Sequence, residues 1–397
     1  MRILMVLDHR FPPDIRVENE ALSLVEAGFE VGLLAIGPDR RPARETWEGV
    51  RIFRDRVPGK MRDWLRGLSG TLNLPSRWLA RRIRAVHREW PFDALHLHDL
   101  YLFGGGLLAG ATLQVPVVGD LHENWVEALK KYAWSTRFPG RLVVSIPRWE
   151  RLERQWVNAV DRLIVVVAEA AVRNQSLGVE SGRIVEVPNT VRRGGFDADP
   201  IDPDLVSRVR GDSGLTVMYT GGMDIHRGLD VAVDAMREVA ALRPDAQLVL
   251  VGEGRIRPEL EARAAGLPVR FEGWQPQSTI RSYIEAADVC LVPHRRTRHT
   301  DATLPHKLFH YMYAARPVVV TDCRPLDRIV AAEGCGLVVP DGDAQAMASA
   351  ILAIGSDESV AREMGARGRE AVDKRWNWEA TSRGMIGMYR DLARQTG

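Results

Sequence analysis

The sequence predicts an α/β protein made of two doubly wound domains. Short runs rich in valine, isoleucine and leucine alternate with amphipathic helical stretches along almost the whole chain. Such continuous apolar strands are expected where helices cover both faces of a parallel sheet. A loop at 188–204, rich in proline, glycine and aspartate, separates two series of these runs. The length of 397 residues is also that of about two domains.

The first series opens with a strand at 2–8, "RILMVLD", followed by a helical pattern. In this pattern Val17, Ala21 and Leu24 fall on one face, and Gly28 ends the helix. Further apolar runs predict strands at 30–36, 93–99, 115–120 and 162–167.

The second series follows the loop, and the domain boundary is expected near residue 190. Its helical patterns separate runs that predict strands at 215–222, 246–254, 269–274, 288–293, 316–322 and 336–340. In doubly wound sheets ligands bind beyond the carboxyl ends of the strands, so those ends are where functional residues are expected.

Composition narrows the class of protein. The net charge of +2 gives no support for nucleic-acid binding. Cys290, Cys323 and Cys335 have no CxxC spacing and lie among apolar or turn residues, which suggests buried thiols in a reducing compartment. No apolar run has the length of a membrane span, and the first residues are typical of a strand rather than a secretion signal. We expect a cytoplasmic protein.

Positive charge gathers near two strand ends of the second domain. Arg227 stands just ahead of a helical pattern, and "LPHKLFHYM" at 304–312 places Lys307 in a first helical turn. Cations beside helix N-termini suit an anion such as a diphosphate. His306 and His310 have the spacing of a zinc pair, but the surrounding arginines and the lack of a third ligand argue against a metal. Solvated or stacked histidines are the alternative, especially for His306.

Six motifs in order make the chain similar to glycosyltransferase family 4. They are "FPPDIRVENEALSLVEAGFEV", "DLHENW", "YTGGMDIHRGLD", "VGEG", "FEGW" and "LPHKLFHYMYAARPVVVTD". The resemblance implies the GT-B fold, with two Rossmann-like domains facing across a cleft: 1–190 for the acceptor and 191–375 for the nucleotide-sugar. A helix at 376–397 would cross back to the first domain. It also implies transfer of a sugar from a nucleotide-diphosphate donor with retention of configuration, without a metal or other cofactor.

The same resemblance assigns individual roles. Arg227 and Lys307 correspond to the two cations of the family that bind the diphosphate. His122 corresponds to the histidine that faces the transferred sugar, where it would orient sugar or acceptor; an ordinary buried histidine is the alternative. Further contacts with the donor are implied for Gly222, Glu253, Trp274 and Gln275.

Two departures from the family pattern concern its glutamate pair, which would fall at Ala302 and His310. Asp301 and Thr303 are then the candidates for recognising the donor sugar. A neutral imidazole offers one acceptor nitrogen, so His310 is expected to make one hydrogen bond to the ribose. Without a carboxylate nucleophile, we favour front-face attack, in which the leaving phosphate helps to take the acceptor proton. Met223 replaces an arginine that many members keep, which leaves fewer cations at the diphosphate.

Acceptor-side residues are expected in the first domain. His98 and Asp99 end one strand, Glu123 follows His122, and Arg16 lies in the first strand–helix connection, where it would contact donor phosphate or acceptor. A capping aspartate with a packed histidine is an equal alternative for the pair at 98–99.

Residues 56–90 combine nine cationic side chains with Trp64, Trp78 and Trp90. Such a segment could dock peripherally on an anionic membrane where a lipid-linked acceptor is found, or it could be a solvated helix face whose tryptophans pack inward.

The sequence is also compatible with two other functions. A GT-B nucleotide-sugar 2-epimerase would need paired acid and base carboxylates, and a non-catalytic nucleotide-sugar-binding subunit would need none. The acceptor could be a lipid-linked glycan, a polysaccharide or a small natural product.

Overall fold

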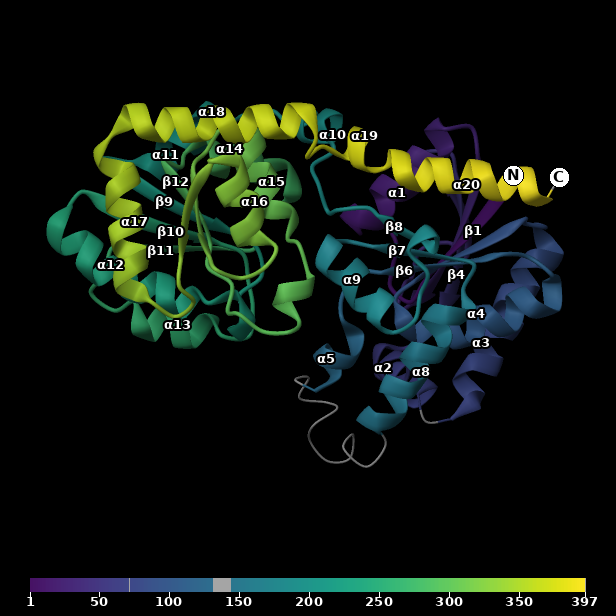
Figure 1. The fold of residues 1–397 in the computed structure, drawn as a ribbon. Helices are drawn as coiled ribbons and strands as arrows, with labels where there is room; N and C mark the ends of the chain where they lie inside the picture. The colour runs from purple at the N-terminus through teal and green to yellow at the C-terminus, as the bar shows by residue number, and fades with distance from the viewer. Residues whose placement is uncertain (71, 131–143, 397) are drawn as a thin grey trace. The chain divides into compact units, whose positions relative to one another are not determined.

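The structure is a computed structural model that describes residues 1–70, 72–130 and 144–396. The chain forms two compact units (Figure 1). Unit 1 contains Met1–Pro188 and Ser382–Gly397, and unit 2 contains Asn189–Thr381. The chain therefore leaves unit 1 two residues before the expected boundary at 190. It returns at Ser382, whereas the sequence placed that return at 376.

Unit 1 is built on a sheet whose strands have the order β3-β4-β2-β1-β5-β6-β7-β8. Every neighbouring pair is parallel except β3 with β4. The strands are β1 (Arg2–Leu7), β2 (Glu30–Gly37), β3 (Arg44–Trp47), β4 (Val50–Arg56), β5 (Ala94–His98), β6 (Val117–Leu121), β7 (Arg162–Val165) and β8 (Ile184–Glu186).

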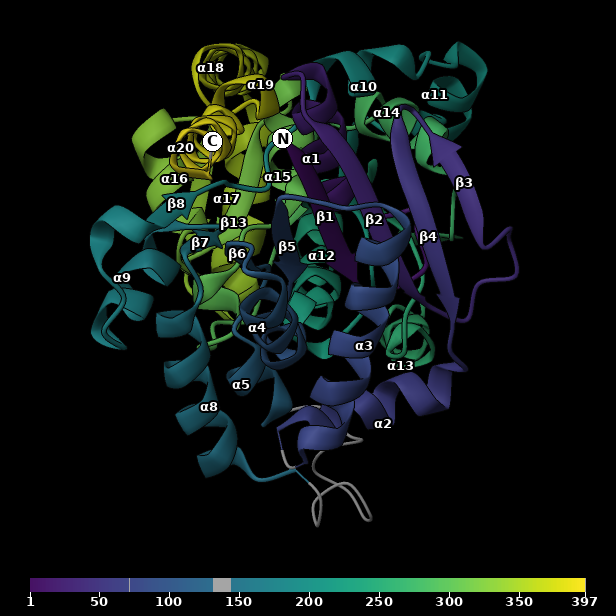
Figure 2. The same ribbon diagram turned by 90° about the vertical axis from the view of Figure 1, so that its right-hand side faces the viewer.

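Helices cover both faces of this sheet, with α1 and α20 on one side and α3, α4 and α8 on the other (Figures 1 and 2). The glycine run in α4 lets that helix approach its neighbours closely, because a Cβ at Gly106 would lie 2.1 Å from Leu97. The helices are α1 (Ile15–Glu26), α2 (Gly59–Ser69), α3 (Asn73–Glu89), α4 (Leu100–Leu113), α5 (Trp125–Leu129), α8 (Ile146–Ala159), α9 (Ala168–Ser176) and α20 (Arg383–Thr396).

Unit 2 contains a parallel sheet of order β11-β10-β9-β12-β13-β14. Its strands are β9 (Leu215–Thr220), β10 (Ala246–Val251), β11 (Val269–Gly273), β12 (Val289–Val292), β13 (Val318–Thr321) and β14 (Gly336–Val339). Its helices are α10 (Arg193–Ala198), α11 (Pro203–Arg210), α12 (Leu229–Leu242), α13 (Arg257–Arg263), α14 (Ile280–Glu285), α15 (His306–Tyr313), α16 (Leu326–Glu333), α17 (Ala344–Ser356), α18 (Glu358–Lys374) and α19 (Trp378–Thr381).

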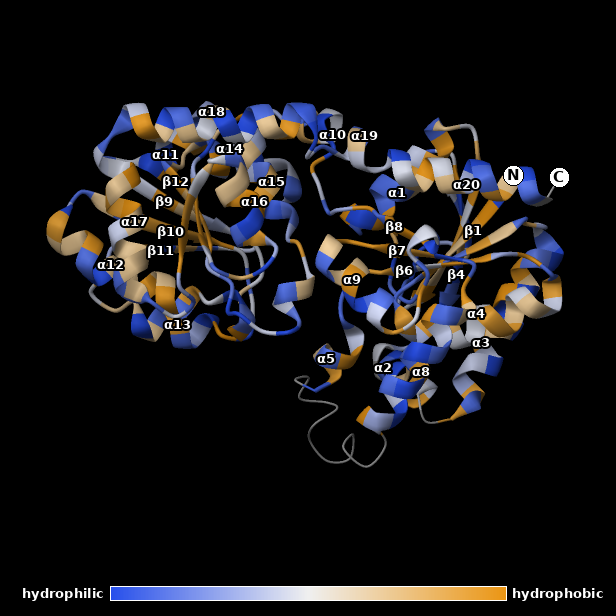
Figure 3. Cartoon of the chain, in the orientation of Figure 1, coloured by the Kyte–Doolittle hydropathy of each residue, from blue (hydrophilic) through white to orange (hydrophobic). Residues whose placement is uncertain are grey.

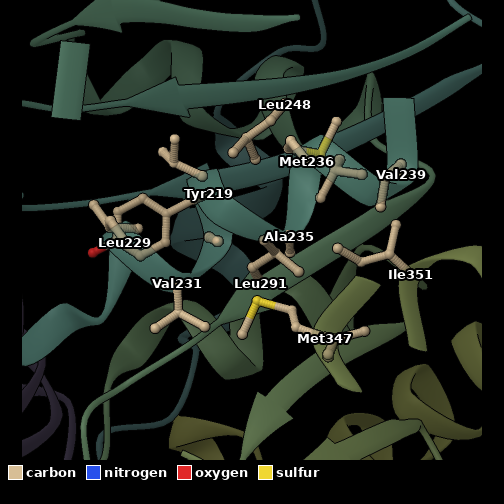
Figure 4. Packing of buried hydrophobic residues seen from close by; sticks show 14 of the residues in the cluster. Tyr219, Leu229, Val231, Ala235, Met236, Val239, Leu248, Leu291, Met347 and Ile351 are labelled. Carbon is tan, nitrogen blue, oxygen red and sulfur yellow. The ribbon is translucent and has the colours of Figure 1, made fainter. Parts of the chain in front are cut away.

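The core of unit 2 lies between its sheet, α12 and α17. Figure 4 shows Met236, Leu248, Leu291, Met347 and Ile351 packed together there, and all five are buried. The strands of both sheets are mostly hydrophobic (Figure 3), as the continuous apolar runs predicted.

Three strands and the helices of one segment were not predicted. The sequence analysis missed β3, β4 and β8. β4 alternates buried and exposed residues at its start because it pairs with the exposed edge strand β3, so it lacks a continuous apolar run. The segment at 188–204, expected to be a loop, contains α10 and the start of α11.

Candidate active site

The first loop of the candidate site in unit 2 follows β9. Gly221 has a φ of 131°, and a Cβ there would lie 2.6 Å from Lys307 Nζ. The positive φ favours glycine at this position, and the absence of a side chain leaves room for the lysine. Tyr219 donates a 2.7 Å hydrogen bond to the carbonyl of Gly222. The "YTGG" motif thus lies against the ammonium group of Lys307.

Lys307 supplies that ammonium group from the first turn of α15. Its Nζ is shielded from solvent and lies 3.6 Å from the centre of the Tyr219 ring. Among the described residues it has no hydrogen-bond acceptor. Burial and the nearby charge of Arg227 both lower the pKa of Lys307 well below its usual range. A buried cation without an anionic partner is costly, and a group perturbed in this way is a candidate for a binding site.

Arg227 approaches from the short helix Ile225–Arg227 that precedes α12. Its Nη1 lies 2.9 Å from His294 Nε2, and since a guanidinium only donates, His294 is the acceptor. Burial and the charges of Arg227 and Lys307 lower the pKa of His294 well below its usual range, so this histidine stays neutral. Gly228 follows with a φ of 64°, and a Cβ there would lie 1.9 Å from the carbonyl oxygen of Pro293. This close approach brings Arg227 against the end of β12.

His310 lies one turn beyond His306 on α15. Its ring centre is 5.3 Å from that of Phe196 and 6.4 Å from that of His306. Burial lowers the pKa of His310 to about 4, so its imidazole is neutral at pH 7. A neutral ring with one acceptor nitrogen is the form on which the expected ribose contact depends.

The other residues expected at the donor show three kinds of environment. Glu253 is exposed and pairs with Arg257, and its carbonyl accepts from Met223 N at 2.9 Å. Trp274 is 72% exposed after the end of β11. Gln275 donates a 2.7 Å hydrogen bond to the carbonyl of Glu272. Trp274 therefore keeps an exposed face that a base could cover.

Asp301 and Thr303, the candidates for sugar recognition, both make hydrogen bonds within unit 2. Asp301 Oδ1 accepts from Arg324 N at 3.1 Å, and Thr303 Oγ1 donates to the carbonyl of Thr300 at 3.4 Å. Ala302 is buried. In this conformation neither side chain is presented without a partner.

Met223, where many family members keep an arginine, is fully buried in the core of unit 2. A Cβ at Gly254 would lie 2.2 Å from the Met223 carbonyl oxygen, so the two glycine loops pack backbone to backbone. Because this side chain points into the core, it adds no charge to the site.

In unit 1 the candidate site is centred on His122. Its side chain is 19% exposed, and its Nε2 lies 2.8 Å from Asp120 Oδ2. Burial would lower the pKa of His122, but the charges of Asp120 and Asp99 outweigh it and raise that pKa to about 10. The imidazole is therefore protonated at pH 7 and acts as a hydrogen-bond donor rather than a base.

The structure contradicts the role predicted for Arg16. It was predicted to contact phosphate or acceptor, but its guanidinium is buried and lies 2.9 Å from both Asp120 Oδ1 and Glu20 Oε1. It also donates to the carbonyl of Val187 at 2.9 Å. Burial would raise the pKa of Asp120, yet the charges of Arg16 and His122 hold it well below its usual range. Arg16 thus neutralises buried carboxylates within unit 1.

His96 and His98 complete this cluster at the end of β5. Both are fully buried, and His98 Nδ1 lies 3.1 Å from His122 Nε2. Burial lowers the pKa of both histidines, which keeps them neutral. His98 therefore contacts His122 from inside the fold. Because its ring is fully buried, His98 does not offer the direct contact with an acceptor that the sequence predicted.

The same cluster contains enough ligand atoms to be a candidate metal site. Ligand atoms of Glu20, His96, His98 and Asp120 lie within 4.8 Å of one another. A divalent ion there would lie beside the buried guanidinium of Arg16, which already pairs with both carboxylates. We therefore interpret the cluster as an ion-pair network.

Asp99 caps the end of β5 in a strained conformation, with a φ of 74°. Its Oδ2 accepts from the Tyr101 hydroxyl at 3.0 Å, and that hydroxyl also lies 2.8 Å from Asp8 Oδ1. Asp8 in turn pairs with Arg66. Glu123 is half-buried next to His122. Backbone strain of this kind is typical of functional sites.

Sequence reasoning missed Asp8, Glu20, Arg66, His96, Asp120 and His294 as site residues. Some signal was present, because "HLH" and "DLH" each place two polar side chains on one face of a strand. Asp120 and His122 are such a pair, and so are His96 and His98.

Solved structures of known proteins define the fold class. A sucrose-phosphate synthase from Thermosynechococcus elongatus matches with a TM-score of 0.77 and 20% identity, covering 100% of both chains. Anabaena HepE in complex with UDP matches with a TM-score of 0.72 and 13% identity, covering 98% of this chain and 100% of that one. The two Rossmann-like units thus make this a protein of the GT-B class.

Sequence matches identify the family. Residues 13–190 match the "Glycosyl transferase 4-like domain" and residues 214–357 match "Glycosyl transferases group 1". The chain belongs to glycosyltransferase family 4, and it is a glycosyltransferase that takes its sugar from a nucleotide donor.

The individual relatives have low sequence identity to this chain. A phosphatidyl-myo-inositol mannosyltransferase of Mycolicibacterium smegmatis is 27% identical over 99% of this chain and 94% of its own length. A 2-deoxystreptamine glucosyltransferase of Streptomyces kanamyceticus is 26% identical over 70% of this chain and 74% of its own. Among the described residues, no helix is both long and apolar enough to cross a membrane.

Proposed function

We propose that the protein transfers a sugar from a nucleoside-diphosphate donor to a hydroxyl acceptor, with retention of configuration and without a metal. The observation that carries this proposal is the buried ammonium of Lys307 beside Arg227. Among the described residues neither cation has a carboxylate partner, although 2.9 Å separates Arg227 from neutral His294. A diphosphate would neutralise both cations and accept their hydrogen bonds.

The chemistry follows from the same two cations. Negative charge builds on the leaving phosphate as the bond to the sugar breaks, and Lys307 and Arg227 would stabilise it in a site with little water. This supplies the charge that a metal provides in other transferases.

Retention is proposed because the site residues favour front-face attack. The position that family members use for a sugar-facing glutamate holds buried Ala302. His122 is held as a cation by Asp120 and so would donate to the sugar or acceptor rather than attack it. The leaving phosphate is then the group that takes the acceptor proton.

Donor binding would also use His310 for a ribose hydroxyl and the exposed ring of Trp274 near the base. Solved structures with this fold include HepE with UDP-glucose and a trehalose-6-phosphate protein from E. coli with UDP-2-fluoro glucose. These complexes make UDP-sugars the first donors to test.

The test is calorimetric titration of UDP, GDP, ADP and dTDP and their sugars into wild type and Lys307→Met. Because the diphosphate raises the depressed pKa of Lys307, binding should take up protons, and affinity should fall as pH rises between the free and bound pKa values. Lys374→Met, at an exposed lysine, is the control. If no nucleotide binds, or if Lys307→Met binds as tightly as wild type, the proposal is wrong.

Product analysis separates transfer from the alternatives. An epimerase would convert its donor without an acceptor, whereas a transferase needs an acceptor or releases free sugar slowly by hydrolysis. A binding subunit would leave the donor unchanged. The anomeric configuration of the product, read by NMR, tests retention directly.

A lipid-linked acceptor is proposed from the surface of α2 and α3. Met61, Leu72 and Leu74 are 48%, 49% and 68% exposed, and the exposed side chains of Arg77 and Arg81 lie on α3. Among the described residues neither arginine has an ion-pair partner, and exposed apolar groups with such arginines suit an anionic membrane surface. Relatives named phosphatidyl-myo-inositol mannosyltransferase match almost the whole chain and point to the same acceptor class.

The tryptophans of this segment contribute less than expected. Trp90 is buried, and a Cβ on Gly32 would lie 2.4 Å from its ring. Trp78 is half-buried beside a small cavity of about 40 Å³. The side chains of Lys60 and Trp64, and residue 71, lie outside the described residues.

Co-sedimentation with liposomes tests the membrane proposal. Wild type should bind vesicles with anionic lipid and not neutral ones, and Leu72→Ser with Leu74→Ser should weaken binding about tenfold. Val172→Ser, at a 65% exposed valine on α9, is the control. Absence of binding to anionic vesicles would end the membrane proposal without affecting the donor site.

A further inference from the structure

Tyr389 is a buried polar side chain on α20, the helix that returns to unit 1. Its neighbours Met385, Met388 and Leu392 form the buried apolar face of that helix. Tyr389 is itself fully buried, and its hydroxyl lies 2.9 Å from His96 Nδ1. A buried hydroxyl on an apolar helix face is costly unless it is hydrogen-bonded, so His96 is its structural partner.

The other nitrogen of His96 faces negative charge. His96 Nε2 lies 3.5 Å from Glu20 Oε2 and 3.6 Å from Asp120 Oδ2. A neutral imidazole has one N–H and one lone pair. Burial raises the pKa of Glu20 well above its usual range, whereas Arg16 and His122 keep Asp120 ionised, so a lone pair facing Asp120 Oδ2 would be repelled. The proton therefore belongs on Nε2, and Nδ1 accepts from Tyr389. Burial raises the pKa of Tyr389 well above its usual range, which keeps this hydroxyl a donor.

Asp120 joins this contact to His122. Its Oδ2, which faces His96 Nε2, also accepts the 2.8 Å hydrogen bond from His122 Nε2. A path thus runs from Tyr389 on α20, through His96 on β5 and Asp120 on β6, to the partly exposed His122.

We propose that Tyr389 is a positioning residue of the unit 1 site: its hydroxyl fixes the Nε2–H tautomer of His96, which holds Asp120 in the orientation that presents His122. The role of His122 in transfer rests on the proposed function, whereas the chain of contacts does not: it consists of two hydrogen bonds joined by the 3.6 Å approach of His96 Nε2 to Asp120 Oδ2. Tyr389 is fully buried, and among the described residues its hydroxyl is hydrogen-bonded to His96, so we expect it to act through His96.

The first test reads the tautomer itself. Long-range ¹H–¹⁵N NMR of ¹⁵N-histidine-labelled wild type, with His96→Asn used to assign the signal, should show the proton of His96 on Nε2. Tyr389→Phe should shift His96 wholly or partly to the Nδ1–H form and perturb the His122 signals. A wild-type Nδ1–H tautomer, or a His96 spectrum that Tyr389→Phe leaves unchanged, would overturn the proposal.

The second test is kinetic. Loss of a residue that orients a metal-bound histidine costs roughly 10- to 100-fold, and for this longer path we expect kcat to fall about tenfold in Tyr389→Phe. The donor KM should stay within about twofold, because the proposed donor contacts lie in unit 2. Met388→Leu, a buried apolar change on the same helix, should keep wild-type kcat.

A double-mutant cycle tests the path. If Tyr389 acts through His96, adding Tyr389→Phe to His96→Asn should lower kcat no further. Independent, multiplicative losses would contradict the path. If wild type transfers no sugar at all, the proposed function fails, and the tautomer measurement alone then decides this inference.

Discussion

Buried charge is handled in opposite ways at the two candidate sites. In unit 1 both Arg16 and His122 lie within hydrogen-bonding distance of Asp120, so the cations have an anionic partner inside the fold. In unit 2 Lys307 and Arg227 lie near each other, and the described residues provide no anion for either. Unit 1 therefore holds an imidazolium that is already paired with an anion, whereas the two cations of unit 2 could be paired by an anionic ligand.

The largest effect on stability is expected when Asp120, the anion shared by two cations of unit 1, is replaced. Asp120→Asn removes the anion that serves both Arg16 and His122, and breaking such a buried pair costs about 3–5 kcal/mol of the free energy of unfolding. Urea denaturation would measure this loss. Asp245→Asn, on the surface of unit 2, should cost little. Equal stability of the two variants would mean that the unit 1 network is not the stabilising unit described above.

Filling the uncompensated site with an apolar group should have the reverse effect on stability. Lys307→Met should lower kcat by about 100-fold or more, because the leaving diphosphate loses a cation. It should also raise the melting temperature by about 2–4 °C, the effect of about 1 kcal/mol in a domain of this size.

The sign follows from the depressed pKa of Lys307 in the folded protein. Holding the charged form in the fold costs stability at neutral pH, and that cost disappears above the ordinary pKa of 10.5. The gain in melting temperature should therefore shrink toward zero at high pH. A variant less stable than wild type at pH 7 would show that Lys307 is compensated in the free protein.

The pH dependence of unit 1 should run in the other direction. The folded pKa of His122 is raised from 6.5 to about 10, so its stabilisation is fully present below pH 6.5 and is lost as pH rises toward 10. We expect wild type to exceed His122→Asn by about 2 kcal/mol at pH 6 and by almost nothing at pH 10. Denaturation at pH 6, 8 and 10 measures this, and a difference that does not change with pH would contradict the raised pKa.

The smallest expected effect concerns the ribose. His310→Glu would restore two acceptor oxygens and should tighten binding of the nucleoside diphosphate by about 1 kcal/mol, or roughly fivefold. His310→Ala should weaken it by a similar amount. Calorimetry measures both, and two variants that bind as wild type does would remove His310 from the donor site.

Local sequence was enough for most elements because parallel strands covered on both faces are continuously apolar. The second series of runs predicted every strand from β9 to β14, and the position of Lys307 in the first turn of α15 could be read from "LPHKLFHYM". The same reasoning failed for β4, because an exposed partner strand breaks the apolar run on which the prediction depends.

The architecture, the family and the two cations at strand ends could be predicted from the sequence, since they depend on periodicity and on residues close together in the chain. The partners of the buried polar groups in unit 1 could not be predicted and are known from the folded structure alone. Arg16 meets Asp120 across 104 residues, and Tyr389 meets His96 across 293. Buried charges and hydroxyls must find partners wherever the fold brings them, and no local pattern records which distant residue that will be.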